Sequence, residues 1–199
     1  MPVDDTLQRT SPSVLVVDDE PLVAETIGAL ARADLGLRAD TAGSVDEALA
    51  LIRSNGLYGA VLLDFHMPDT DGSSAFRAIT GANDGRVAIF SGLAQISEIS
   101  DLISREKASF ILKNSPTKDI ISAIDFLIQG YFVMVSSSRS LCIGIDKLSL
   151  LRGREFNVLI LAAIGLSPEE ISDNLQLNVK IVNQDSKNAL RKLGFDAKL

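Results

Sequence analysis

Five short apolar runs between residues 13 and 130 constrain the fold of this chain more than any other feature. Runs of this length, bounded by turn signals, are typical of strands buried on both faces of a parallel sheet. The stretches between them carry apolar residues at helical spacing, and two begin with a capping box or a proline. Alternating strands and helices predict an α/β domain built on a doubly wound, five-stranded parallel sheet. The runs are 14–17, 37–42, 59–63, 87–90 and 110–112.

Polar residues follow four of these runs at once. Asp18 and Asp19 end the first, Asp64 the third, Ser91 the fourth and Lys113 the fifth. The carboxyl ends of parallel strands meet at one edge of the sheet, where such folds bind ligands. Any one of these residues alone is readily explained as a loop or capping residue. Four strand ends that each carry a suitable group indicate a functional site.

Three carboxylates in close quarters repel one another and require a cation. Oxygen ligands with open positions left over suit Mg²⁺. We expect Asp19 and Asp64 to bind the metal directly, Asp18 to act through a water, and the backbone carbonyl of His66 to complete the set. Once the metal screens its charge, Asp64 can attack a phosphorus atom as aspartyl nucleophiles do.

The neighbouring residues suit the product of such an attack. A phosphoryl group carries about two negative charges and three acceptor oxygens. Lys113 would neutralise one oxygen and Ser91 would donate a hydroxyl to another. An aspartyl phosphatase is the competing interpretation, but those enzymes commonly have a second Asp where this chain has His66. The phosphoryl group is therefore expected to persist as a signal, with the His66 side chain as a loop residue that tunes hydrolysis.

The same residues resemble the receiver domain of two-component response regulators. The resemblance covers residues 13–130 and implies a flavodoxin-like fold. It also implies phosphotransfer from a sensor histidine kinase onto Asp64, and a switch in which Ser91 moves toward the phosphate while the Phe110 ring swings inward. Core packing explains Phe110 equally well. The matching motifs are Asp18-Asp19, the loop from Asp64 through Met67-Pro68 to Asp71-Gly72, Ser91-Gly92, and Phe110 to Lys113.

The rest of the chain predicts a linker and a small all-α domain. Residues 131–149 include three consecutive serines and lack helical periodicity, which favours a linker, although 131–135 could pair as a short strand. Residues 150–199 predict three helices: one that begins at Arg154 and stops at Gly165, and two more joined by a tight turn, the last longer and basic, as in a helix-turn-helix domain. The residues expected to contact DNA lie on that last helix: Lys180, Asn183, Gln184, Lys187 and Arg191.

Residues 150–195 resemble the LuxR-like output domain of NarL/FixJ-type regulators. The chain departs from that family at Ile181-Val182-Asn183-Gln184-Asp185, where a Thr-Val-Lys-Asn-His pattern is usual. We therefore expect Asp185 to repel DNA phosphates and to weaken binding. The family's fourth helix, which often carries dimer contacts, does not follow before Leu199.

Composition limits the cellular compartment and the binding partners that suit this chain. Cys142 is the only cysteine, so an intramolecular disulfide is excluded and a reducing compartment is expected. No stretch of about 18 uncharged apolar residues occurs, which argues against a membrane protein. Residues 1–12 are polar and predict a flexible tail. Residues 13–130 hold 9 Lys/Arg against 17 Asp/Glu, so this half is not expected to bind nucleic acid.

These observations predict a cytoplasmic, phosphorylation-controlled transcription regulator rather than an enzyme with an external substrate. Its partners would be Mg²⁺, a sensor histidine kinase and DNA, with a homodimer forming on phosphorylation. Helix 96–105, with Ile96, Ile99 and Ile103, is a candidate contact face, although core packing explains these residues equally well. The alternative is a phosphorelay or protein-interaction regulator whose helix-turn-helix domain no longer binds DNA.

Overall fold

The structure, a computed structural model, describes residues 12–68, 70–84, 86–92, 96–136 and 140–195. The tail predicted for residues 1–12 lies, apart from Pro12, outside this part. No helix within it is long and apolar enough to cross a bilayer.

A single sheet of seven strands runs through the described part of the molecule, in the order β2-β1-β3-β4-β5-β6-β7. Neighbouring strands are parallel except for the last pair, β6 and β7, which are antiparallel. The strands are β1 (Ser13–Val17), β2 (Arg38–Ala42), β3 (Ala60–Asp64), β4 (Val87–Ser91), β5 (Ser109–Leu112), β6 (Tyr131–Val135) and β7 (Ser140–Gly144).

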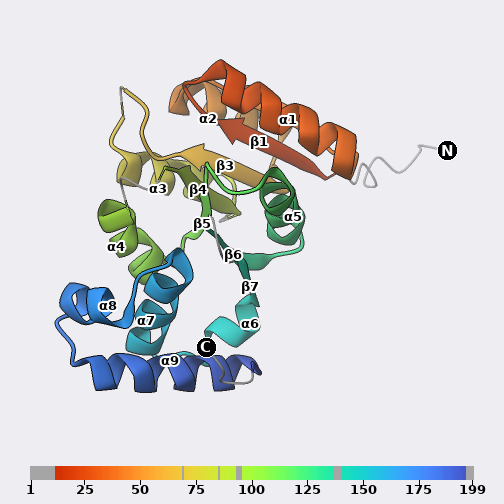
Figure 1. Cartoon of the computed structure of the whole chain (residues 1–199). Helices are drawn as coiled ribbons and strands as arrows, with labels where there is room; N and C mark the ends of the chain where they lie inside the picture. Colours follow the sequence, from red (N-terminus) through yellow and green to blue (C-terminus); the bar gives the residue numbers. More distant parts are fainter. Residues whose placement is uncertain (1–11, 69, 85, 93–95, 137–139, 196–199) are drawn as a thin grey trace.

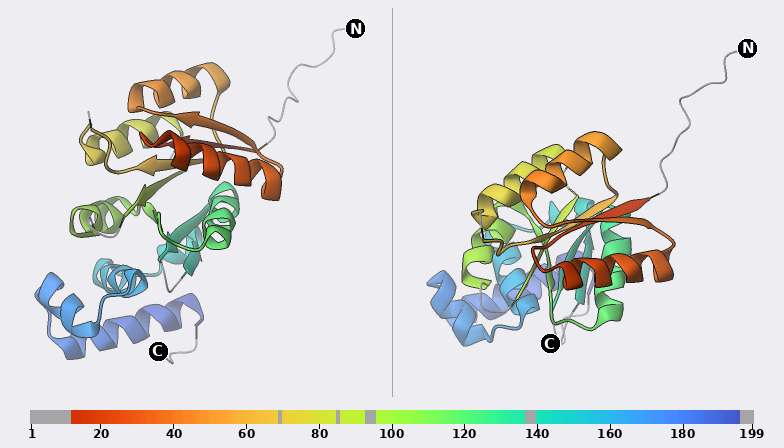
Figure 2. Two further views of the ribbon diagram at one scale, coloured as in Figure 1. Left: turned by 45° about the horizontal axis from the view of Figure 1, so that its top comes forward. Right: turned by 90° about the horizontal axis from the view of Figure 1, so that it is seen from above.

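Helices cover both faces of the sheet (Figures 1 and 2). Two helices, α1 and α5, pack on one face, and α2, α3 and α4 pack on the other. The helices are α1 (Pro21–Leu35), α2 (Val45–Asn55), α3 (Gly72–Ala82), α4 (Ile96–Glu106), α5 (Thr117–Ile128), α6 (Ile145–Leu148), α7 (Gly153–Ile164), α8 (Pro168–Leu175) and α9 (Val179–Leu193).

The central strands explain the short apolar runs of the sequence. Every residue of β1, β3, β4 and β5 is buried. Strands covered by helices on both faces must be apolar throughout, not alternately. The predicted five-stranded parallel sheet is therefore confirmed for β1 to β5, in the order of a doubly wound fold.

The segment predicted as a linker, residues 131–149, instead holds β6, β7 and α6. Strand β6 extends the sheet parallel to β5, and β7 folds back along β6. The physical reason is the run Phe132–Val135, whose four side chains are all buried. This is the same signal as in the central strands, but the serines that follow it favoured a linker. Residues 137–139 lie outside the described part.

The C-terminal helices continue the layer formed by α2, α3 and α4. Helix α7 contacts both α4 and β6, and the Phe156 ring packs edge-on against Phe132 with centroids 5.6 Å apart. The hydroxyl of Ser136 donates to the carbonyl of Ala163 at 3.0 Å. One apolar cluster extends from α2 through α4 and β6 into α7, α8 and α9. The helix-turn-helix segment and the sheet therefore share a core.

Local signals in the sequence fix the ends of these last helices. Ser167 caps α8 in a capping box with Glu170, and Pro168 occupies the first turn. Gln176 ends α8 in a left-handed conformation (φ 52°). The Asn178 side chain then caps α9 by accepting from the backbone N–H of Lys180 at 2.9 Å.

Candidate functional site

The carboxyl edge of the sheet brings the predicted acidic residues together. Asp18 follows β1 and Asp64 ends β3, and a carboxylate oxygen of each lies within 4.8 Å of one from Asp19. Asp18 and Asp64 are 1% and 4% exposed, whereas Asp19 is exposed. Two buried carboxylates and one exposed carboxylate therefore form one cluster at the sheet edge.

Lys113 supplies the positive charge of the site from the end of β5. Its Nζ lies 2.7 Å from Asp18 Oδ2 and 2.9 Å from Asp64 Oδ2. Burial alone would lower the pKa of Lys113, but the interactions with Asp18 and Asp64 outweigh it and raise that pKa. For Asp18, burial is the main cause and raises the pKa, while the interaction with Lys113 opposes this increase. The amine stays protonated between the two carboxylates.

Backbone groups fix the orientation of both buried carboxylates. The N–H of Glu20 donates to Asp18 Oδ1 at 3.0 Å, and the N–H of His66 donates to Asp64 Oδ1 at 3.0 Å. One oxygen of Asp64 is therefore held by the loop after β3 and the other by Lys113. The Asp64 carboxylate is therefore fixed in one orientation at the sheet edge.

The donor set fits a magnesium ion. Three carboxylates and one lysine leave a local charge of about −2, and hard oxygen donors are the ligands that Mg²⁺ prefers. A cleft of about 710 Å³ opens beside Asp19 and is lined by the loop after β3, including His66, Pro68 and Asp71. The Asp19 side of the acidic cluster is therefore open to solvent.

Two features of this loop were not assigned roles from the sequence. Asp71 caps α3 by accepting from the backbone N–H (2.9 Å) and the hydroxyl (2.7 Å) of Ser74. These bonds lower the pKa of the exposed Asp71 carboxyl. A Cβ on Gly72 would lie 2.4 Å from the carbonyl oxygen of Phe65, so only glycine fits there. An Asp-Gly pair followed by serines is the signal that could have identified this cap.

Ser91 and Phe110 lie where the strand pattern places them. Ser91 ends β4 and is buried, and its carbonyl accepts from the backbone N–H of Lys113 at 2.9 Å. Phe110 is fully buried in the cluster that continues to α7, opposite Ile89 on β4 and Met134 on β6. The structure thus agrees with core packing for Phe110, and the switch motion of both residues stays a prediction.

The candidate contact face on α4 is mostly internal. Ile99 and Ile103 are fully buried in the core, so packing accounts for them. The side chain of Ile96 lies outside the described part of the structure.

The five residues predicted to contact DNA share one exposed face of α9. Lys180, Asn183, Gln184, Lys187 and Arg191 are all exposed, and each lies three or four residues from another member of the set, which places them on one side of the helix. Helix α9 lies at the end of the molecule farthest from α1 (Figure 1). The receiver therefore does not cover this face.

The expectation that Asp185 repels DNA is wrong. Asp185 is 5% exposed and turns toward α7, where it pairs with the guanidinium of Arg154. This pairing is the main cause that raises the pKa of Arg154. Lys192 pairs with Glu155 on α7 at 2.6 Å in the same way. These two ion pairs attach α9 to α7. The carboxylate of Asp185 therefore faces α7 and does not lie on the outer face with the five residues above.

The fold and the site together define a class of α/β protein: a flavodoxin-like sheet with an acidic cluster and a lysine at its carboxyl edge. The sequence profile of the response regulator receiver domain matches residues 14–125. The chain belongs to the response regulator receiver domain family.

Relatives that match nearly the whole chain are named as regulators. The Fimbriae Z protein of Salmonella typhimurium is 25% identical over 92% of this chain and 90% of its own. The transcriptional regulatory protein MctR of Rhizobium johnstonii is 29% identical over 94% and 90%. The nitrate/nitrite response regulator protein NarP of Escherichia coli is 27% identical over 96% and 93%.

Solved structures show the same architecture. A response regulator receiver domain protein from Clostridium thermocellum covers 60% of this chain and 95% of its own, with 28% identity and a TM-score of 0.53. The response regulator RcsB, solved as a DNA complex, covers 94% of both chains with 20% identity and a TM-score of 0.53. The second likeness shows the fold alone, and it includes the C-terminal helices.

Proposed function

We propose that this protein is a phosphorylation-dependent response regulator that accepts a phosphoryl group on Asp64 and controls transcription through α9. The observation that carries the proposal is the position of Asp64: it is buried, held by the His66 N–H and Lys113, and adjacent to Asp18 and Asp19. A sensor histidine kinase would donate the phosphoryl group in the cytoplasm. Beyond its own phosphotransfer and a slow dephosphorylation, the protein would not act as an enzyme.

The residues of the site divide the chemistry between them. An oxygen of Asp64 forms a bond to phosphorus while the bond from phosphorus to the donor's leaving atom breaks, which yields an acyl phosphate. Asp19, Asp64 and the His66 carbonyl, with Asp18 through a water, would hold Mg²⁺, which neutralises charge when bound. Lys113 would move from its ion pairs to a phosphoryl oxygen, and the Ser91 hydroxyl would donate to another.

The outer face of α9 supports DNA binding as the output. Lys180, Lys187 and Arg191 would contact phosphates, while Asn183 and Gln184 would reach base edges. The inward turn of Asp185 removes the objection that its charge would repel DNA, although Asn183 and Asp185 still replace the lysine and histidine of the usual pattern. MctR is named as a transcriptional regulatory protein, and RcsB was solved with DNA. No observation favours the alternative of a domain that has lost DNA binding.

The acceptor is tested with a small phosphodonor such as acetyl phosphate in the presence of Mg²⁺. We expect Asp64→Asn to abolish an acid-labile phosphoryl adduct, detected by intact mass. Asp71→Asn is the matched control, because asparagine caps a helix as well as aspartate does, and it should retain labelling. Undiminished labelling of Asp64→Asn would show that another residue is the acceptor.

The output is tested by DNA titrations over a range of salt concentrations. If Lys187 neutralises one phosphate, Lys187→Gln should make the slope of log affinity against log salt less negative by about 0.9. Lys118→Gln, an exposed change on α5, should leave the slope unchanged. Absence of specific binding with and without phosphodonor would favour the protein-interaction alternative.

A further inference from the structure

The last strand of the sheet, β7, has an unpaired edge. Its inner side pairs with β6 from Ser140 opposite Val135 to Gly144 opposite Tyr131. No strand in the described part of the chain lies along its outer side. Backbone N–H and C=O groups on that side are therefore available to another strand.

The two edges of the sheet differ in their protection. Strand β2, at the opposite edge, carries the charged residues Arg38 and Asp40. Strand β7 has the sequence Ser-Leu-Cys-Ile-Gly, without a charge or a proline. Proteins commonly place charges, prolines or bulges on edge strands to prevent pairing between molecules. That protection is present on β2 and missing on β7.

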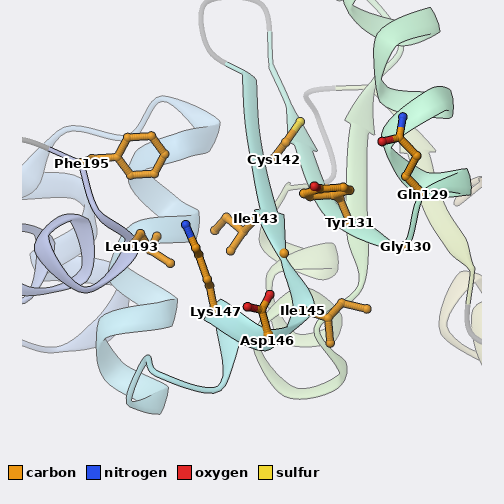
Figure 3. A pocket seen from close by; sticks show the side chains of 11 residues that line it. Gln129, Gly130, Tyr131, Cys142, Ile143, Ile145, Asp146, Lys147, Leu193 and Phe195 are labelled. Atoms are coloured by element: carbon orange, nitrogen blue, oxygen red, sulfur yellow. The ribbon is translucent and has the colours of Figure 1, made fainter.

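Two hollows border β7, one with a mixed polar and apolar lining and one with a mainly apolar lining. One cavity of about 430 Å³ is lined by Ile143, Ile145, Leu193 and Phe195, with Tyr131 beyond the strand (Figure 3). Ile145 is 65% exposed and Phe195 48%. A second cavity of about 260 Å³ lies at the other end of the strand and is lined by Leu141, Leu159 and Leu190. A strand added beside β7 would bring its own side chains over both hollows.

Charge does not oppose a symmetrical arrangement at this edge. The charged residues that line the larger cavity are Asp146 and Lys147, one of each sign. An isologous interface places the same patch against itself, so a patch with a net charge would repel its copy. The lining of the larger cavity has no net charge, and the alternating donors and acceptors of the β7 edge match those of another strand edge.

We propose that β7 is the contact by which two copies of this chain form a dimer, with their β7 strands antiparallel in one continuous sheet. A two-fold axis at Cys142 pairs all five residues, because Ser140 then faces Gly144 of the partner subunit. Leu141 faces Ile143 of the partner subunit on the α9 side, which extends the row of apolar side chains across the hollows. The proposal depends neither on the chemistry of Asp64 nor on DNA binding.

Cys142 provides a direct test, since it is the only cysteine. Residues directly opposite in an antiparallel pair have Cα atoms about 4.5 or 5.5 Å apart, within the range of about 4.4–6.8 Å that a disulfide allows. Mild oxidation of the full chain with diamide should yield a covalent dimer that dithiothreitol reverses. Oxidation should be compared with and without acetyl phosphate.

The matched control moves the thiol by two residues, as Ser140→Cys with Cys142→Ser. Position 140 is more exposed than Cys142, so random collisions would cross-link it faster. In the proposed register its two copies lie about 13 Å apart along the strand direction, four residues at 3.3 Å each. We therefore expect much slower cross-linking, and equal or faster cross-linking would overturn the proposal.

Sedimentation velocity gives a second readout that does not use the thiol. Leu141→Lys should shift the chain from dimer to monomer with an unchanged circular dichroism spectrum, because it places two charges at the two-fold interface. Thr41→Lys on the opposite edge should leave the dimer intact. A chain that is monomeric with and without phosphodonor, or a dimer that persists in Leu141→Lys, would overturn the proposal.

Discussion

Among the residues that the structure describes, Lys113 is the cation paired with the two carboxylates buried at the end of the sheet. In the structure it pairs with both Asp18 and Asp64, and a bound metal ion would perform the same neutralisation. The lysine and the metal ion would therefore act on the same carboxylates. Loss of the lysine should make the stability of the protein depend more strongly on the metal ion.

We predict that Lys113→Gln makes thermal stability strongly dependent on magnesium. Without the lysine charge, Asp18 and Asp64 repel one another until Mg²⁺ binds, so added Mg²⁺ should raise the Tm more in this variant than in the unmodified chain. Thermal unfolding with 10 mM MgCl₂ and with excess chelator measures the difference. Lys118→Gln should respond as the unmodified chain does, and an equal Mg²⁺ response in Lys113→Gln would contradict the prediction.

Asp185 gives a second test at the level of one side chain. Because it faces Arg154 and not solvent, Asp185→Asn should lower the free energy of unfolding by about 1 kcal/mol, through loss of a charge-assisted hydrogen bond. DNA affinity should not rise. A clear gain in affinity, measured by titration at constant salt, would mean that the carboxylate faces DNA after all.

The position of Asp185 also shows what the sequence could have predicted. Its spacing from Val182, Ala189 and Leu193 places it on the buried stripe of α9. The burial of Asp185 could therefore have been predicted from the sequence. Its ion-pair partner could not have been predicted, because Arg154 lies 31 residues earlier and only the packing of α7 on α9 brings it near. By contrast, Asp18, Asp64 and Lys113 were predictable as neighbours because parallel strand ends must meet.

At the scale of elements, β6 and α7 form the junction between the receiver sheet and the output helices. The sequence predicted β1 to β5 through the length and apolarity of the runs. It left 131–135 open between a short strand and part of a linker, and the structure confirms the strand as β6. Its pairing with β5 could not be predicted, because the turn residues that follow are equally typical of a linker. The contact of Phe132 with Phe156 is likewise set by tertiary packing.

We predict that Phe132→Ala destabilises the protein by about 3 to 5 kcal/mol, the usual cost of removing a buried aromatic ring. Phe132 is almost fully buried between β6 and α7. Urea unfolding followed by circular dichroism measures the loss. Leu22→Ala, at a largely exposed position of α1, is the control and should stay within about 0.5 kcal/mol. A similar small effect of Phe132→Ala would mean that this contact does not hold the two parts together.

At the scale of the whole molecule, the apolar cluster passes without interruption from the receiver helices into α9. Units that share a core unfold together, whereas units joined by a flexible linker unfold separately. We therefore predict one calorimetric transition whose van't Hoff and calorimetric enthalpies agree. Two resolved transitions, or an enthalpy ratio far from one, would indicate independent units.

The shared core has a consequence for exchanging output modules between regulators of this family. A splice at residue 130 would remove β6 and expose the outer edge of β5, and a splice at residue 150 would leave Phe132 without Phe156. In either hybrid the incoming domain would have to supply a matching apolar surface. A grafted output that retains the β6–β7 hairpin and the α7 face opposite it would keep the surfaces that the receiver needs.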